Sequence, residues 1–191
     1  MLIRSQNNPF EWAVDVRITP QTEPHIATWL DPATGIAYAK AIHQDYSSLI
    51  TPSNPARPGE IVHLYLTGLG PLDQDVPTGT PGPVSPLARP LAKLNCMLGS
   101  PSSPPLQMPD LFYAVALIGI YQAGIVIPAN VPQGTSTLYC STSDASGVQL
   151  TGALLSTTSI SAVSASGAPQ ETLFRLQPTR YWTALERYRS N

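Results

Sequence analysis

Glycines in the segment TGLGP, residues 67–71, are the first candidates for chemistry, because glycine-rich loops can bind phosphate. A dinucleotide-binding loop needs the pattern G-x-G-x-x-G at the start of a helix, and a phosphate loop needs G-x-x-x-x-G-K-[ST]. Here Gly68 and Gly70 are followed by Pro71, with neither a helical pattern nor a lysine behind them. We therefore interpret both glycines as turn residues that can adopt positive φ.

Metal ligation is the second chemistry to consider. His25, His43 and His63 show neither i,i+3 nor i,i+4 spacing and have no cysteine or carboxylate pair beside them, so we expect structural or surface roles. Asp73 and Asp75 could share a calcium ion. No glycine-bracketed series of oxygen ligands accompanies them, which favours a solvated loop. The sequence predicts no metal site and no cofactor.

Nucleophilic catalysis finds no support in the sequence. A serine nucleophile in a G-x-S-x-G turn is missing, since GTST at residues 134–137 lacks the final glycine. A reactive cysteine needs polar, basic surroundings, whereas both cysteines of this chain have leucines as same-face neighbours. No carboxylate pair stands out as an acid and base couple. The sequence therefore predicts a protein that is not an enzyme.

The two cysteines instead point to a structural role. Cys96 lies between Leu94 and Leu98 in an alternating pattern, and Cys140 shares a strand face with Leu138. Both thiols are expected to face one core, bonded or nearly so, following the logic of the immunoglobulin cross-link. The alternative is two separate buried thiols. A bond would indicate an oxidising compartment.

The composition indicates which secondary-structure elements position these residues. The 191 residues include 21 prolines and 13 glycines, and only 12% are charged, which favours short strands joined by many turns. Turn residues recur every 8–12 positions through residues 46–165, a spacing typical of a β-sandwich. Strands are expected at residues 60–67, 91–98 and 136–143, two more within 111–128, and a last one at 155–163.

Charge and hydropathy limit the partners. The net charge is −2 and the chain has two lysines, Lys40 and Lys93, so no basic stripe can neutralise a run of phosphates. We expect no nucleic-acid partner. No apolar run reaches the roughly 18 residues of a membrane-spanning helix, so no membrane span is expected.

The chain divides into three expected segments. Residues 1–45 contain an alternating strand near residues 11–19 and are interpreted as the remnant of a preceding β-sandwich module. Residues 46–167 form the sandwich, and residues 168–191 form a tail with a short helix at 180–189. The start of the chain shows no secretion signal, so the chain either stays inside the cell or is a piece of a longer exported polypeptide.

Four segments carry a family resemblance: AIHQDYSSLITPSNPA, NPARPGEIVHLYLTGLGP, SPLA and IYQAGIVIPANVPQGTSTL. Over residues 14–165 the chain resembles the uncharacterised C-terminal domain, Solibacter type, of large exported proteins of soil acidobacteria. That domain is similar to the TIG/IPT class of immunoglobulin-like β-sandwiches. The chain departs from the family at MLGS (residues 97–100), around residues 118–120, where the family's APG is absent, and after residue 168.

The resemblance implies a fold and structural positions, and no catalytic residue. By it, Gly59 precedes the first central strand, Gly68 and Gly70 make the turn after it, and Gly134 opens a late hairpin strand. It also implies an extracellular or cell-surface location, and a fold that is all-β and immunoglobulin-like, to which the sequence adds the short C-terminal helix.

The function expected is that of a non-enzymatic β-sandwich module of a larger extracytoplasmic protein, serving as spacer, in adhesion or in ligand presentation. Its partners would be neighbouring modules of the same protein. One alternative is a carbohydrate-binding accessory module, which would need an exposed aromatic platform from Trp12, Trp29 or Trp182. Another is a subunit that assembles by strand addition, with a protein as its ligand.

Overall fold

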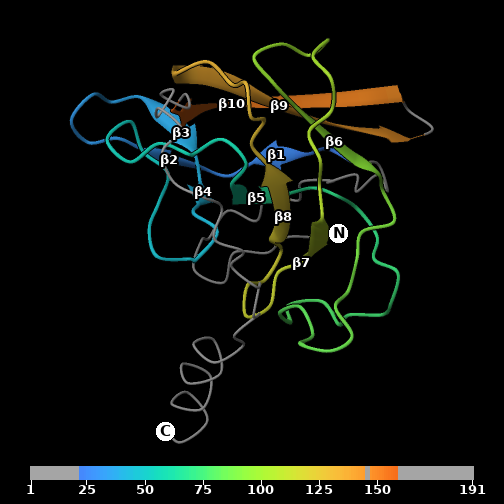
Figure 1. The fold of residues 1–191 in the computed structure, drawn as a ribbon. Helices are drawn as coiled ribbons and strands as arrows, with labels where there is room; N and C mark the ends of the chain where they lie inside the picture. Colours follow the sequence, from blue (N-terminus) through green and yellow to red (C-terminus); the bar gives the residue numbers. More distant parts are fainter. Residues whose placement is uncertain (1–21, 145–146, 159–191) are drawn as a thin grey trace, which may run out of the picture. The chain divides into compact units, whose positions relative to one another are not determined.

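The computed structural model describes residues 22–144 and 147–158, and every regular element in these ranges is a strand (Figure 1). The chain divides into two compact units, Met1–Ser161 and Ala162–Asn191, and all described residues belong to the first. The all-β prediction is therefore confirmed for the described residues. The strand expected near residues 11–19, the helix at 180–189, Trp12 and Trp182 lie outside them.

Ten strands form two five-stranded sheets. Sheet A has the order β1-β5-β8-β7, with β4 paired to β5 as well, and sheet B has the order β2-β3-β10-β9-β6. All pairs are antiparallel except β3 with β10. The strands are β1 (His25–Ile26), β2 (Thr28–Leu30), β3 (Ala37–Ala39), β4 (Ala41–Ile42), β5 (Ile61–Thr67), β6 (Leu94–Leu98), β7 (Asp110–Tyr113), β8 (Tyr121–Val126), β9 (Gly134–Asp144) and β10 (Gly147–Thr157).

One hydrophobic core joins the inner faces of both sheets, as in a β-sandwich. Sheet A contributes Val62 and Leu64 from β5, and sheet B contributes Leu138 from β9 and Leu155 from β10, each of them at most 1% exposed. β5 is also buried on its outer face, where His63 and Tyr65 lie. β5 is therefore the central strand of sheet A.

A hairpin at the N-terminal end belongs to both sheets. The first arm consists of β1, which pairs with β5, and β2, which pairs with β3. The second arm consists of β3, which lies in sheet B, and β4, which pairs with β5. Asp31 closes the tip, because its carboxylate accepts hydrogen bonds from the Ala33 N–H and the Thr34 hydroxyl. The strands of residues 25–42 thus add to edges of the sandwich that follows them in sequence.

Two strands differ most from their expected bounds. β7 ends at Tyr113, because the chain turns out of the sheet through Ala116 at φ 66° and returns where the Ala114 N–H bonds to the Ile120 carbonyl. β10 begins at Gly147, earlier than the strand expected at 155–163. In β10, the apolar Val148 and Leu150 are exposed and Gly152 has no side chain, so apolar and polar residues do not alternate between the two faces of the sheet.

Candidate functional site

The four glycines expected at structural positions all have positive φ: Gly59 (79°), Gly68 (76°), Gly70 (77°) and Gly134 (118°). Gly59 follows Pro58 in a turn closed by the Glu60 N–H and the Arg57 carbonyl, 3.1 Å apart, as in a type II turn. This turn leads directly into β5. Gly134 is the first residue of β9. The positions therefore serve backbone geometry.

Gly68 lies where two parts of the chain cross. A Cβ built on it would stand 1.8 Å from the carbonyl oxygen of Glu23. The Glu23 N–H in turn donates to the Gly68 carbonyl over 2.8 Å. The segment TGLGP is thus a turn that lets the N-terminal chain pass against the end of β5.

The loop after this turn borders a shallow hollow of about 770 Å³ that is lined by Asp73 and Asp75, the pair considered as calcium ligands. Asp73 accepts a hydrogen bond from the Arg89 N–H over 2.8 Å, and both Asp73 and Asp75 are exposed. No group of three or more potential metal ligands occurs within residues 22–144 and 147–158. Tyr121 also lines the hollow, and its hydroxyl donates to the Gly70 carbonyl; burial and the nearby Tyr113 raise the pKa of Tyr121.

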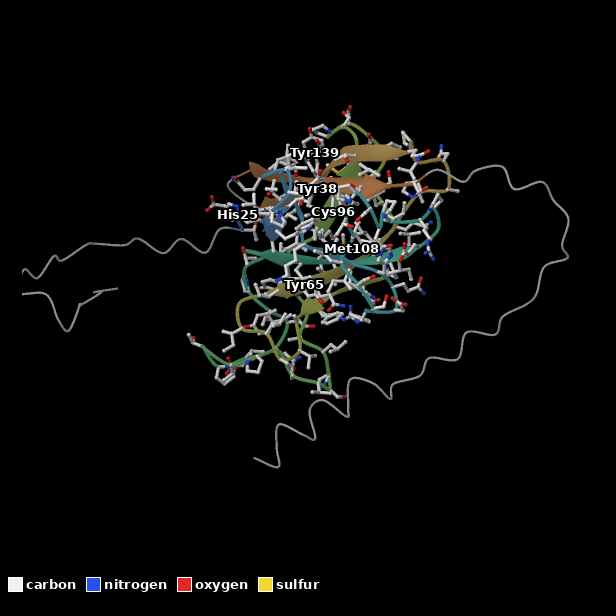
Figure 2. The ribbon with its side chains drawn as sticks, turned by 90° about the vertical axis from the view of Figure 1, so that its left-hand side faces the viewer. His25, Tyr38, Tyr65, Cys96, Met108 and Tyr139 are labelled. Atoms are coloured by element: carbon white, nitrogen blue, oxygen red, sulfur yellow. A yellow bond between two sulfur atoms is a disulfide. The ribbon has the colours of Figure 1, made fainter. Side chains whose placement is uncertain are left out.

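Cys96 and Cys140 form a disulfide with their Cα atoms 4.1 Å apart. They lie directly opposite each other in the β6–β9 ladder. The Cys96 carbonyl accepts the Leu106 N–H, so it points away from β9 and the cysteines form a non-hydrogen-bonded pair. Such pairs bring their Cα atoms within about 4.5 Å of each other, so the strand register itself aligns the thiols. Both side chains are fully buried (Figure 2 labels Cys96).

The position of this bond corrects one expectation. The immunoglobulin cross-link joins the two sheets of the sandwich. In this chain both cysteines belong to sheet B, and the bond joins neighbouring strands. Both thiols face the core as expected, but they cross-link one sheet only.

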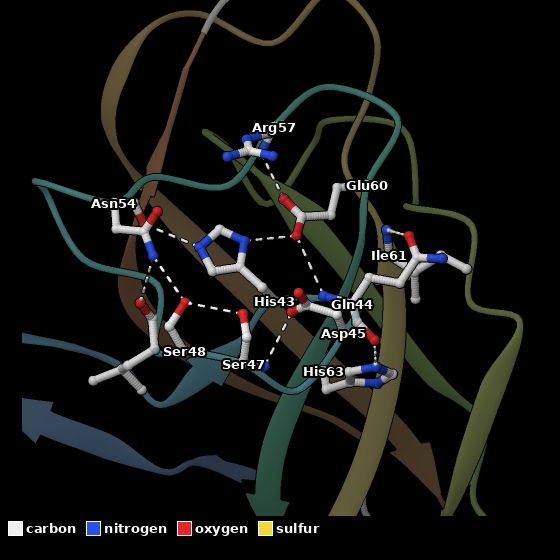
Figure 3. A network of polar contacts seen from close by, with 11 residues as sticks. His43, Gln44, Asp45, Ser47, Ser48, Asn54, Arg57, Glu60, Ile61 and His63 are labelled. Atoms are coloured by element: carbon white, nitrogen blue, oxygen red, sulfur yellow. Dashed lines mark hydrogen bonds and ion pairs between the residues drawn. The ribbon is translucent and has the colours of Figure 1, made fainter. Parts of the chain in front are cut away.

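His43 and Glu60 form the centre of a polar network beside β5 (Figure 3). The His43 Nδ1 atom lies 2.6 Å from Glu60 Oε1, and its Nε2 atom lies 3.3 Å from the Asn54 carbonyl. The second carboxylate oxygen of Glu60 accepts the Arg57 N–H over 2.8 Å. Both His43 and Glu60 are largely buried. Every ring nitrogen and carboxylate oxygen of the pair thus has a partner that holds the loop between β4 and β5.

His63 forms a second buried contact set on the outer face of sheet A. Its Nε2 atom donates to the Gln44 carbonyl over 3.1 Å, and its Nδ1 atom faces the Gln122 amide nitrogen at 3.3 Å. The Tyr46 ring stacks on the imidazole at 4.0 Å. These contacts suit a neutral ring with the proton on Nε2. Burial lowers the pKa of His63 and outweighs the opposing effects of the Gln44 bond and of nearby carboxylates.

The His43–Glu60 pair has the residue types of an acid and base dyad but not the geometry. A general base needs a free nitrogen within reach of a substrate proton. In His43 one nitrogen contacts a carboxylate and the other a backbone carbonyl. The third histidine, His25, is exposed beside Glu23 at 3.5 Å. The arrangement in the described residues is therefore suited to fixing loops.

Aromatic side chains form a row on the outer face of sheet B. Trp29, Tyr38 and Tyr139, here called the aromatic row, come from β2, β3 and β9 (Figure 2 labels the two tyrosines). Trp29 pairs directly with Tyr38, and their rings stack at 5.4 Å with an interplanar angle of 23°. Tyr38 is buried, with 7% of its surface exposed, whereas Trp29 and Tyr139 are half-buried. Of the three tryptophans proposed for a platform, Trp29 thus retains partial exposure.

A second hollow, of about 630 Å³, opens between the ends of β6 and β8. Its lining is mostly apolar and includes Pro104, Pro105, Pro128 and Pro132. Prolines cannot donate to a β-ladder and are typical of protected sheet edges. The edge of β6 is also covered where Leu106 donates to Cys96. This side of the sandwich is poorly suited to accept an added strand.

No family model, curated protein or solved structure matches this chain. Among the described residues, no helix has the length and apolar character that crossing a membrane would require.

Proposed function

We propose that this chain is a non-enzymatic, immunoglobulin-like β-sandwich module of a larger extracytoplasmic protein, where it acts as a spacer or presents a ligand-binding surface. The observation that carries the proposal is the buried Cys96–Cys140 disulfide. Stable disulfides are typical of oxidising compartments outside the cytoplasm.

The polar groups of the site support a structural role as well. His43 and Glu60 contact each other and also backbone groups of Asn54 and Arg57. His63 donates to the backbone carbonyl of Gln44. The glycine-rich turn TGLGP serves a chain crossing in place of a ligand. The resemblance to the Solibacter-type domain, and through it to TIG/IPT sandwiches, agrees with such a module.

Export can be tested by comparing one chain in two compartments. The chain is produced in a bacterial cytoplasm and, behind a cleavable secretion signal, in the periplasm, and its thiols are titrated in denaturant. We expect exported protein without free thiols and with a higher unfolding midpoint than the cytoplasmic form. Two free thiols in the exported protein, or equal midpoints for the oxidised and reduced forms, would contradict the proposal.

Strand addition is the weaker alternative. It needs an uncovered strand edge, and β2, which ends sheet B opposite β6, is only three residues long. A carbohydrate-binding role has more support, because aromatic side chains share one outer face of the sandwich.

A further inference from the structure

The outer face of sheet B has an unusual composition. The five strands of this sheet contain a single charged residue, Asp144, the last residue of β9. Solvent-facing protein surfaces normally carry roughly a quarter to a third charged residues. This face instead carries aromatic, hydroxyl and amide side chains, with Val148 and Leu150 exposed toward one end of β10.

Tyr139 packs beside a glycine on this face. Gly152 pairs with Tyr139 across β9 and β10, and a Cβ at Gly152 would stand 3.2 Å from Tyr139 Cδ1. Gly152 does not have positive φ, so its backbone conformation would accept other residues. Its small size therefore leaves room for the Tyr139 ring, which is half-buried.

The second aromatic group lies across β10 from Tyr139. Tyr38 pairs with Leu154 of β10, and Trp29 stacks on Tyr38 from the edge strand β2. β3 and β9 flank β10, so Tyr38 and Tyr139 are two strand spacings, about 10 Å, apart across the sheet. They are also offset by two residues along it, because Leu154 pairs with Tyr38 and with Thr137. Between and beside them lie neutral hydroxyl and amide groups, among them Thr137, Ser141 and Asn95.

Trp29 also carries an unexplained donor. Its Nε1 atom is buried and lacks a hydrogen-bond partner, the only such side-chain atom found in the described part of the chain. Buried polar groups normally have partners, so an exception needs a reason. The Trp29 ring is partly exposed but its Nε1 atom is not, so this donor could meet a ligand hydroxyl only if its neighbours shifted.

We propose that Trp29 and Tyr139, the partly exposed members of the aromatic row, and their neutral surroundings bind an uncharged polysaccharide. The apolar faces of sugar rings stack on aromatic side chains, and sugar hydroxyls pair with the neutral polar groups between them. The lack of charge on the face favours a neutral chain over an anionic one. This inference rests on the proposed function, since it names the ligand that an extracytoplasmic module would present.

Binding is tested with the whole chain by affinity gel electrophoresis in soluble mixed-linkage β-glucan and by depletion with microcrystalline cellulose. Polygalacturonate is the anionic comparison. Tyr139→Ala and Trp29→Ala remove the two stacking groups, and Ile118→Ala is the matched control, because Ile118 is an apolar loop residue with 59% exposure away from sheet B. We expect both aromatic variants to weaken glucan binding about tenfold, which corresponds to about 1.4 kcal/mol. Ile118→Ala should bind as the unaltered chain does.

Ser141→Arg covers the case in which an aromatic variant does not fold. It places a charge on the same face without altering the core, and it should also reduce glucan binding. The proposal is overturned if neither neutral glucan binds, if polygalacturonate binds as well as they do, or if Ile118→Ala is as impaired as Tyr139→Ala. Dimers in light scattering that Leu150→Lys abolishes, without glucan binding, would assign the face to a second copy of the chain. None of these results would affect the disulfide or the evidence for export.

Discussion

Gly68 and Gly59 separate two effects of glycine at the residue scale. Both adopt positive φ, but a Cβ at Gly68 would meet the Glu23 carbonyl at 1.8 Å, whereas no atom lies within 4 Å of a Cβ at Gly59. Gly59→Ala should therefore lower the unfolding free energy by about 1–2 kcal/mol, because alanine would have to adopt the left-handed conformation. Gly68→Ala should cost clearly more, because the chain crossing must open. Urea unfolding of both variants measures the difference, and equal losses would contradict the crossing.

His63 gives a pH dependence whose direction follows from its burial. The folded state lowers the pKa of His63 below the ordinary 6.5, so the unfolded chain binds the proton more readily. The stability that neutral His63 contributes is complete above about pH 6.5 and is lost as the pH falls toward the lowered value. Asp110 and Glu60 oppose this shift, and Gln122 and Tyr46 contact the ring.

The unfolding free energy measured from pH 8 to pH 5 tests this dependence. His63→Gln keeps a donor for the Gln44 carbonyl but does not titrate. The unaltered chain should lose more stability on acidification than this variant. Parallel curves for the two proteins would show that His63 is not a neutral buried group.

Elements differ in how far the sequence predicts them. β5 and β6 follow from their apolar patterns, because a strand buried in a sandwich needs apolar residues on its inner face. The hairpin of β1–β4 follows only in part: DPATG (residues 31–35) has the composition of a turn and a short alternation follows it, but strands of two or three residues do not show that they change sheets. The aromatic row joins β2, β3 and β9, and its assembly depends on cross-strand register that local sequence does not encode.

The hairpin offers a test of how the N-terminal part docks. Ala41 in β4 is fully buried in the core, whereas the adjacent Lys40 is exposed. Ala41→Asp should lower the unfolding free energy by several kcal/mol, because it buries an unpaired charge. Lys40→Asp should change it by about 0.5 kcal/mol or less. If the two variants unfold alike, β4 is not part of the core, and residues 1–45 fit better as the remnant of another module.

The disulfide stabilises the fold by joining the paired strands β6 and β9. It closes a loop with a sequence separation of 44 residues. In the chain-entropy model such a loop stabilises the fold by at most about 4 kcal/mol. Replacing both cysteines with alanine should lower the unfolding free energy by up to this amount. Reductant should lower the stability of the unaltered chain similarly and leave the double variant unchanged; an unaltered chain insensitive to reductant would contradict the contribution.

At the scale of the whole molecule, the described residues form a sandwich whose strand edges are short or covered. The outer face of sheet B carries uncharged side chains. A proline-lined hollow borders the β6 edge, and β2 ends the other side of sheet B. An outer face with aromatic and neutral groups can meet a ligand without opening either sheet. These features fit the proposed module, which would present a surface while the disulfide holds β6 and β9 together.

The most direct measurement is the state of Cys96 and Cys140 in the organism that makes this protein. Cells are fractionated with thiols blocked, and the Cys96–Cys140 peptide pair is sought by mass spectrometry without reduction. An extracytoplasmic module predicts the cross-linked pair in the extracellular or surface fraction. Recovery of both cysteines as free, blocked thiols in the cytoplasmic fraction would contradict it.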